Sequence, residues 1–141
     1  MVETPEEMFR FGGSIGRSLK GGEVLLLQGG LGAGKTLLTK GIVAELGFDE
    51  DEVSSPSFSL VNLYRTEMFD VYHIDLWRID EGSNAGFGVG LPEILEDEKA
   101  AVIIEWPERL GNFAFGRPVR RIFIEGDGDL ARKITIKDET G

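Results

Sequence analysis

The segment GGLGAGKT, from Gly29 to Thr36, constrains this chain more than any other part of its sequence. It matches the phosphate-binding loop pattern G-x-x-x-x-G-K-[ST] at every fixed position. Glycines let such a loop turn so tightly that several backbone N–H groups point at one phosphate. Lys35 then supplies a positive charge for the β- and γ-phosphates, and Thr36 supplies a hydroxyl for Mg²⁺. The motif therefore predicts a site for a nucleoside triphosphate.

The residues around the motif favour a strand before it and a helix after it. Residues 23–28 form an apolar run of buried-strand length, and residues 37–46 lack proline and carry apolar side chains at helical spacing. A phosphate-binding loop needs this context, because its amides converge where a strand passes into a helix. The residues expected to contact the nucleotide are Gly30, Leu31, Gly32, Ala33, Gly34, Lys35, Thr36 and Leu37.

The remaining pattern predicts an α/β fold. A continuous apolar run at 101–104 indicates a strand covered on both faces. Helices are expected at 4–20 and 91–98, hairpins at 58–64 with 68–75 and at 119–125 with 133–137, and a glycine-rich loop at 80–90. Glycines at positions 12, 13 and 16 are expected to weaken the first helix. We therefore expect a P-loop NTPase-like three-layer sandwich with a mixed, mainly parallel central sheet and a C-terminal antiparallel hairpin, forming a single domain over residues 1–141.

The net charge of the chain limits the classes of partner that it can bind directly. Its 141 residues include 25 acidic and 15 basic side chains, which gives a formal net charge of −10. A protein that grips nucleic acid unaided normally presents a basic surface, so this balance argues against direct RNA binding. The sequence shows no cysteine, no basic-then-apolar leader and no apolar stretch approaching the ~18 residues of a membrane span. We expect a cytoplasmic protein without membrane contact.

Two acidic residues follow apolar strands at the edge where the loop is also expected. Glu105 ends the run at 101–104, and Asp75 ends the segment at 71–75. Because the carboxyl ends of parallel strands meet at one edge of a sheet, both carboxylates are expected near the phosphates. We assign Glu105, with Thr36, to Mg²⁺, and Asp75 to the attacking water or to the metal shell; a surface carboxylate is the alternative for Glu105. The predicted catalytic residues are Lys35, Asp75 and Glu105.

Several further side chains are candidates for an accessory role. Arg78 and Arg109 follow the two acids closely enough to approach the γ-phosphate, although either could instead pair with a neighbouring carboxylate. Trp106 either stacks at the site or belongs to the core. His73, the only histidine, is interpreted as a packed orienting residue rather than a catalytic one. Hydroxyls in the segment after the second helix can also reach the metal or the γ-phosphate. The switch or accessory set is Ser54, Ser57, Arg78, Trp106 and Arg109.

Four segments together resemble the TsaE family of bacterial P-loop ATPases. They are GGLGAGKT, VSSPSFSLVNLY at 53–64, YHIDLWR at 72–78 and IIEWPERL at 103–110, in the order and spacing of that family. The resemblance spans most of the chain. The last three segments are more specific than the loop, because nucleotide-binding proteins in general do not share them.

The resemblance implies an ATPase that uses ATP and Mg²⁺ and is needed to make threonylcarbamoyladenosine, the modified adenosine beside the anticodon in tRNAs that read codons beginning with A. It implies two partner proteins, TsaB and TsaD, of which TsaD is the transferase. We expect slow ATP hydrolysis by the chain alone and faster hydrolysis beside these partners. The nucleotide cycle is expected to reset the complex of TsaB and TsaD between turnovers. By position, Lys35 and Thr36 hold phosphate and Mg²⁺ and Glu105 is the second metal ligand. Asp75, Trp106 and the serine-containing loop at 53–57 belong to the surroundings of the site, and the tRNA is held mainly by the partners.

Two other functions stay open from the residues alone. A small-molecule kinase shares the loop and the metal site, but such kinases typically close an arginine-bearing lid over the phosphates, and residues 80–90 contain no arginine. A nucleotide-dependent interaction module without significant hydrolysis would also need the loop. A GTPase is disfavoured, because the sequence contains no N-K-x-D motif for reading guanine.

Overall fold

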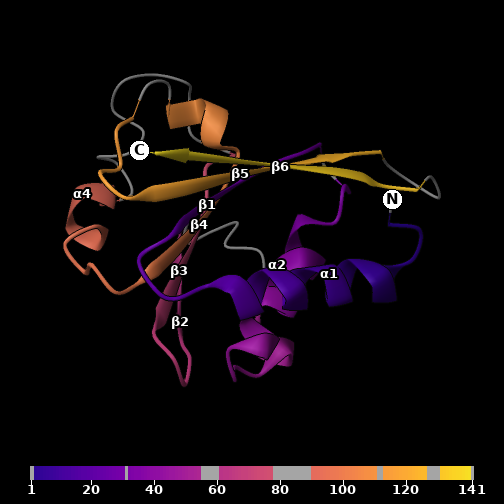
Figure 1. Ribbon diagram of the computed structural model, residues 1–141, viewed down its shortest axis with the longest axis horizontal. Helices are drawn as coiled ribbons and strands as arrows, with labels where there is room; N and C mark the ends of the chain where they lie inside the picture. The colour runs from indigo at the N-terminus through magenta and orange to yellow at the C-terminus, as the bar shows by residue number, and fades with distance from the viewer. Residues whose placement is uncertain are drawn as a thin grey trace.

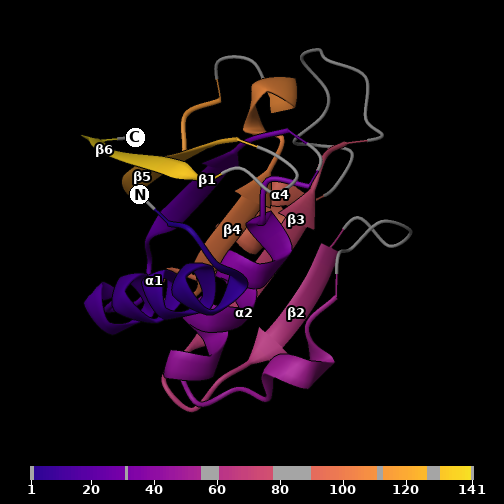
Figure 2. The ribbon, with the colours of Figure 1, turned by 90° about the vertical axis from the view of Figure 1, so that its right-hand side faces the viewer.

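In the part of the chain that the structure describes, six strands form one mixed sheet at the centre of the computed structural model (Figures 1 and 2). The described residues are 2–30, 32–54, 61–77, 90–110, 113–126 and 131–140. The strands lie in the order β2-β3-β4-β1-β5-β6. Their bounds are β1 Val24–Gln28, β2 Val61–Arg65, β3 Asp70–Asp75, β4 Ala101–Glu105, β5 Pro118–Glu125 and β6 Lys133–Thr140.

The four central strands run parallel. β3 pairs with β4, β4 with β1 and β1 with β5, whereas β2 and β6 pair antiparallel with β3 and β5 at the two edges. Every residue of β4 is buried, which fits a strand covered on both faces. The predicted mixed, mainly parallel sheet with a C-terminal antiparallel hairpin is therefore confirmed, and so is the hairpin formed by β2 and β3.

Helices cover the sheet unequally on its two sides. α1 (Pro5–Ser18) and α2 (Lys35–Glu45) lie side by side on one face, and the short α4 (Leu91–Ile94) lies on the other (Figures 1 and 2). Two short 3-10 turns, η1 (Glu50–Glu52) and η2 (Pro107–Leu110), follow α2 and β4. Side chains alternate along the strands, so each face contributes to its own apolar cluster.

Glycines let α1 and α2 pack against each other at close range. A β-carbon at Gly12 would overlap the carbonyl oxygen of Leu38, and one at Gly41 would overlap that of Phe9. The helix α1 continues past its glycines to Ser18 and begins as predicted, with the Thr4 hydroxyl accepting a hydrogen bond of 3.1 Å from the Glu7 amide. Gly12, which lowers helix propensity, is thus required by the contact with α2.

The helix expected over 91–98 is shorter in the structure and ends at Ile94. The guanidinium of Arg117 explains why, because it donates hydrogen bonds to the carbonyls of Leu95, Asp97 and Ala100 where the chain has left the helix. The expected loop at 80–90 lies outside the described residues up to position 89. Within the described ranges, no helix is long and apolar enough to cross a membrane.

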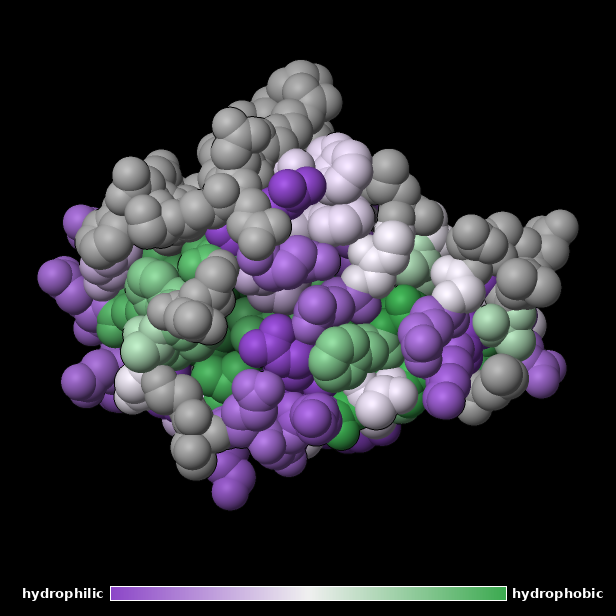
Figure 3. Space-filling view, turned by 90° about the horizontal axis from the view of Figure 1, so that it is seen from above, coloured by the Kyte–Doolittle hydropathy of each residue, from purple (hydrophilic) through white to green (hydrophobic). Residues whose placement is uncertain are grey.

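Hydrophilic residues dominate much of the surface seen from above, with apolar atoms showing between them (Figure 3). Among the described residues, the large apolar side chains with the greatest exposure are Leu63, Met68, Trp77 and Ile136. Single apolar side chains on a surface are ordinary. Trp77 differs from the other three because it belongs to the site described next.

Candidate functional site

The phosphate-binding loop joins the end of β1 to the start of α2. Gly32 and Gly34 have φ values of +78° and +108°, which glycine adopts without strain. Gly34 is also the N-cap of α2, and no side chain caps the helix there. A helix start that lacks a side-chain cap leaves its first amides for a ligand, and the helix dipole favours an anion at this end.

Lys35 opens α2 and is held by groups of the site itself. Its Nζ donates a hydrogen bond of 2.8 Å to the Gly29 carbonyl and lies 3.9 Å from the centroid of the Trp106 ring. Burial lowers the pKa of Lys35, and the negative charges of Glu105, Asp75 and Glu108 oppose this shift. The lysine is therefore a buried cation surrounded by carboxylates at the position where the motif places phosphates.

Asp75 and Glu105 end neighbouring parallel strands at the same level. They are partners in the register of β3 and β4, and Glu105 is in turn the partner of Leu27 on β1, two residues before the loop. Their exposed fractions are only 7% and 3%. Paired residues of parallel strands point to one face, here the face covered by α1 and α2. The structure thus brings together the loop and both carboxylates at the carboxyl ends of the central parallel strands.

The buried His73 lies beside Glu105, and the buried Tyr64 lies beside His73. His73 is fully buried, and its Nε2 lies 2.5 Å from Glu105 Oε2 while its Nδ1 lies 2.9 Å from the Tyr64 hydroxyl. Asp75 Oδ1 accepts a hydrogen bond of 2.9 Å from the Trp77 amide. The sequence indicated an orienting role for His73 but gave no reason to select Tyr64, which lies on another strand.

Trp106 follows Glu105 in an uncommon backbone conformation. Its φ is +59°, a left-handed value that costs a non-glycine residue about 1–3 kcal/mol and tends to be kept at functional sites. Its ring packs on that of Trp77, with the centroids 4.3 Å apart. The Arg109 guanidinium lies 5.8 Å from the Trp77 ring centroid, and Arg109 Nε is a buried donor that has no hydrogen-bond partner within the described part of the chain.

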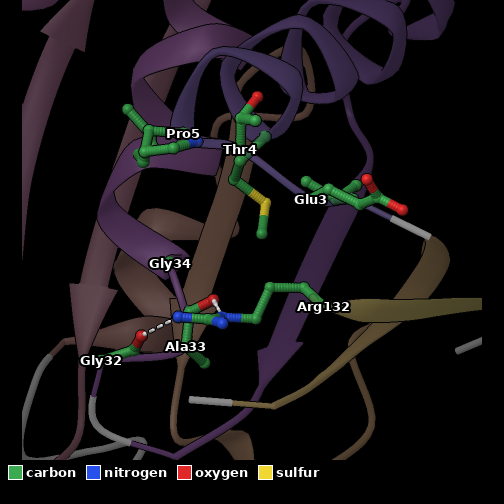
Figure 4. Close-up of a pocket in the computed structure, with 10 residues that line it drawn as sticks. Glu3, Thr4, Pro5, Gly32, Ala33, Gly34 and Arg132 are labelled. Atoms are coloured by element: carbon green, nitrogen blue, oxygen red, sulfur yellow. Dashed lines mark hydrogen bonds between the residues drawn. The ribbon is translucent and has the colours of Figure 1, made fainter. Parts of the chain in front are cut away.

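A cavity of about 350 Å³ lies beside the loop, between the N-terminal segment and Arg132, the residue before β6 (Figure 4). Arg132 reaches across it and donates hydrogen bonds of 3.1 Å to the carbonyls of Gly32 and Ala33. The backbone of Arg132 also pairs with that of Val2 in both directions. The lining residues are Val2, Glu3, Thr4, Pro5, Met8, Gly32, Ala33, Gly34, Leu37 and Arg132. No sequence signal identified this pocket, because its walls come from both ends of the chain.

The other predicted residues have different placements. Thr36 and Leu37 are half-buried in the first turn of α2, Ala33 is buried and Gly30 is exposed. Ser54 presents its carbonyl oxygen, not its hydroxyl, to Asn62 Nδ2 and the Tyr64 hydroxyl, each at 3.2 Å. Three predicted site residues lie outside the described part of the chain, namely Leu31, Ser57 and Arg78.

The donor set suits a nucleotide with Mg²⁺ better than a metal held by protein alone. Among the residues that the structure describes, no three His, Cys, Asp or Glu side chains form a metal site. Mg²⁺ usually takes one or two carboxylates and completes its shell with phosphate oxygens and water. A buried donor without a partner is costly, and an anion would satisfy Arg109 Nε. Thr36, Glu105 and the amides of α2 could supply the remaining groups.

A family model described as threonylcarbamoyl adenosine biosynthesis protein TsaE matches residues 2–134 of the chain. A curated relative from Treponema pallidum, named tRNA threonylcarbamoyladenosine biosynthesis protein TsaE, is 36% identical over 107 residues, which cover 76% of each chain. A relative of the same name from Aquifex aeolicus is 35% identical over 111 residues, which cover 77% of this chain and 76% of the relative.

A solved structure has a similar fold. The crystal structure of YdiB from Bacillus subtilis matches with a TM-score of 0.64 at 27% sequence identity. The match covers 98% of this chain and 82% of YdiB. The similarity therefore extends over nearly all of the sheet and helices described above.

Proposed function

The chain belongs to the TsaE family, and from this premise we propose that it is a Mg²⁺-dependent ATPase that serves the threonylcarbamoyladenosine modification of tRNA. The family match over residues 2–134 supports the pathway. The observation that carries the activity is the juxtaposition of the phosphate-binding loop with the buried carboxylates of Asp75 and Glu105 at one sheet edge. A single domain over residues 1–141 and a cytoplasmic location are parts of the same proposal.

The loop and the neighbouring cavity together suit a whole nucleotide. The amides of the first turn of α2 and the Lys35 ammonium would bind the phosphates. The cavity lined by Thr4, Met8 and Arg132 adjoins Gly32 to Gly34, so the nucleoside would lie there. Its volume of about 350 Å³ is within the usual range for small-molecule sites.

Mg²⁺ would be held by the Thr36 hydroxyl and the Glu105 carboxylate, and it supplies charge neutralisation between the β- and γ-phosphates. Lys35 contributes a positive charge on the same phosphates. Arg109, whose buried Nε has no partner in the described residues, would add charge where the γ-phosphate becomes more negative. Asp75 is positioned to orient the attacking water or to bind within the metal shell.

The proposed output is a change in the partner proteins rather than a group transfer on this chain. ATP hydrolysis would reset the complex of TsaB and TsaD between turnovers, and TsaD would carry out the transfer. The net charge of −10 supports indirect contact with tRNA, because phosphate binding normally needs a basic surface. We expect slow hydrolysis by the chain alone and faster hydrolysis beside both partners.

Phosphate release tests the proposal. We expect release to require Mg²⁺, to rise when TsaB and TsaD are added, and to be abolished by Glu105→Gln or Thr36→Ala. Glu52→Gln removes a carboxylate from η1, past the far end of α2, and should not alter the rate. Full activity in Glu105→Gln would remove Glu105 from the metal site, and no stimulation in an active complex would contradict the proposed partnership.

A further inference from the structure

A line of hydrogen-bonding side chains runs through three adjacent strands to Glu105. Asn62 Nδ2 lies 3.4 Å from the Tyr64 hydroxyl on β2, the hydroxyl lies 2.9 Å from His73 Nδ1 on β3, and His73 Nε2 lies 2.5 Å from Glu105 Oε2 on β4. His73 and Glu105 are 0% and 3% exposed, and Tyr64 is 3% exposed. Buried polar groups at these distances have few other partners, so the line is a fixed part of the core.

The protons available to these side chains determine which group donates and which accepts in each hydrogen bond. A Glu105 that binds Mg²⁺ is ionised and accepts only, so the hydrogen bond to it must come from His73 Nε2–H. In a neutral imidazole Nδ1 then has no proton and must accept, and the donor beside it is the Tyr64 hydroxyl. Burial raises the pKa of Tyr64, which keeps the proton on that hydroxyl.

The remaining contacts agree with that direction. The Ser54 carbonyl, 3.2 Å from the Tyr64 hydroxyl, is a second acceptor for its one proton, but His73 Nδ1 lies closer, at 2.9 Å. The Asn62 amide lies 3.2 Å from that same carbonyl and 3.4 Å from the Tyr64 oxygen, so its two N–H groups can serve both acceptors. The donors of Tyr64 and His73 therefore both point toward Glu105.

We propose that His73 is a positioning residue for Glu105, that its Nε2–H fixes the carboxylate through Oε2 and keeps Oε1 for the metal, and that Tyr64 supports the same tautomer of His73 by donating to Nδ1. This inference rests on the proposed function, in which Glu105 binds Mg²⁺. Partners that orient a metal ligand in this way contribute to metal affinity without touching the metal. His73 and Tyr64 thus extend the site into the buried core, behind the residues that would contact the nucleotide.

Nitrogen NMR tests the tautomer directly. His73 is the only histidine, so protein labelled with ¹⁵N-histidine gives a single pair of ring signals. We expect a protonated Nε2 and an unprotonated Nδ1, both in the free protein and with Mg²⁺ and ADP. In Tyr64→Phe, which keeps the aromatic ring and removes the donor, the Nδ1 signal should shift because Nδ1 loses its hydrogen bond, while Nε2 stays protonated beside Glu105. An Nδ1–H tautomer in the unaltered protein would overturn the inference.

Nucleotide affinity tests the consequence for the metal. The dissociation constant of ADP is measured by calorimetry with Mg²⁺ and with EDTA, and the ratio gives the gain due to the metal. We expect Tyr64→Phe and His73→Leu to reduce that gain by about tenfold while the affinity in EDTA is unchanged, and His73→Gln, which retains an N–H donor, to restore part of it. If His73→Leu does not fold, Tyr64→Phe still tests the same prediction.

A matched control separates this effect from the loss of any buried hydroxyl. Tyr72→Phe removes a hydroxyl from the residue next to His73. The Tyr72 side chain packs in the apolar cluster on the opposite face of the sheet. We expect it to leave the gain from Mg²⁺ unchanged. An equal effect in Tyr64→Phe and Tyr72→Phe would overturn the inference. If the unaltered protein showed no gain from Mg²⁺, the proposed function would fail instead.

Discussion

Lys35 Nζ lies 3.9 Å from the centroid of the Trp106 ring while it donates a hydrogen bond of 2.8 Å to the Gly29 carbonyl. Both partners are groups of the site, and Trp106 holds its ring there with a φ of +59°. A phosphate would compete with the carbonyl and the ring for the same ammonium group. We therefore expect nucleotide binding to be coupled to the surroundings of Trp106.

Tryptophan fluorescence should report this coupling. We expect ADP with Mg²⁺ to change the emission, because the charge next to the Trp106 ring moves toward the phosphates. Trp77 and Trp106 are the two tryptophans of the chain, so each can be replaced in turn. Trp77→Phe should retain most of the response and Trp106→Phe should lose most of it. A response that persists in Trp106→Phe would show that the lysine does not change partners there.

The stability of Lys35→Met should depend on pH. Burial lowers the pKa of Lys35 in the folded protein below 10.5, so the cost of burying its charge is fully present below the lowered pKa. The cost decreases as the pH rises through the lowered pKa toward 10.5, because the folded state then releases the proton first. We expect Lys35→Met to raise the free energy of unfolding at neutral pH, and the gain to shrink in alkaline solution. Urea denaturation of both proteins over this range measures the difference, and a gain that grows with pH would contradict the assignment.

The contact between α1 and α2 should not tolerate a methyl group at Gly41. Alanine favours a helix over glycine by about 1 kcal/mol, but its β-carbon would overlap the Phe9 carbonyl, and overpacking of this kind costs about 1–3 kcal/mol or more. We expect Gly41→Ala to lower the melting temperature. Gly13→Ala is the matched control, since its β-carbon would meet Glu45 Oε2 at an ordinary 3.5 Å. Gly13→Ala should be neutral or stabilising, and equal melting temperatures for both variants would refute the packing explanation.

Arg132 should support nucleotide binding through the loop. Its two hydrogen bonds to the Gly32 and Ala33 carbonyls connect the segment before β6 to the loop, and each such bond contributes about 1 kcal/mol. We expect Arg132→Ala to weaken ADP binding by about tenfold, as measured by calorimetry. Arg120→Ala removes a surface arginine that pairs with Asp138 and should bind ADP normally. Normal ADP affinity in Arg132→Ala would exclude the cavity from the nucleotide site.

Much of the fold could be predicted because its signals are local. The apolar runs at β1 and β4 and the glycine pattern of the loop specify their structure within a few residues. The glycines of α1 were harder to interpret, because Gly12 looks unfavourable until its contact with α2 is known. The early end of α4 also depends on a distant residue, Arg117, which takes over the carbonyls beyond it.

Some residues of the candidate site could likewise be predicted from local sequence patterns, and others could not. Lys35 and Thr36 belong to a contiguous motif, and Glu105 was found because it ends a buried strand. The roles assigned to these residues stay predictions, and Leu31, Ser57 and Arg78 lie outside the described residues. The contact of His73 with Tyr64 and Glu105 depends on the register of three strands, and the cavity depends on Arg132 approaching the loop from the far end of the chain. Such relationships between distant segments leave no local pattern in the sequence.

The central claim is that ATP hydrolysis by this chain lets a TsaB and TsaD complex turn over repeatedly. The most direct measurement counts threonylcarbamoyladenosine formed per TsaD in a reconstituted reaction with excess tRNA, ATP and threonylcarbamoyl donor. We predict many rounds with the unaltered chain, and no more than the first round when the chain is omitted or carries Glu105→Gln. Repeated rounds without the chain, or with Glu105→Gln, would contradict the account.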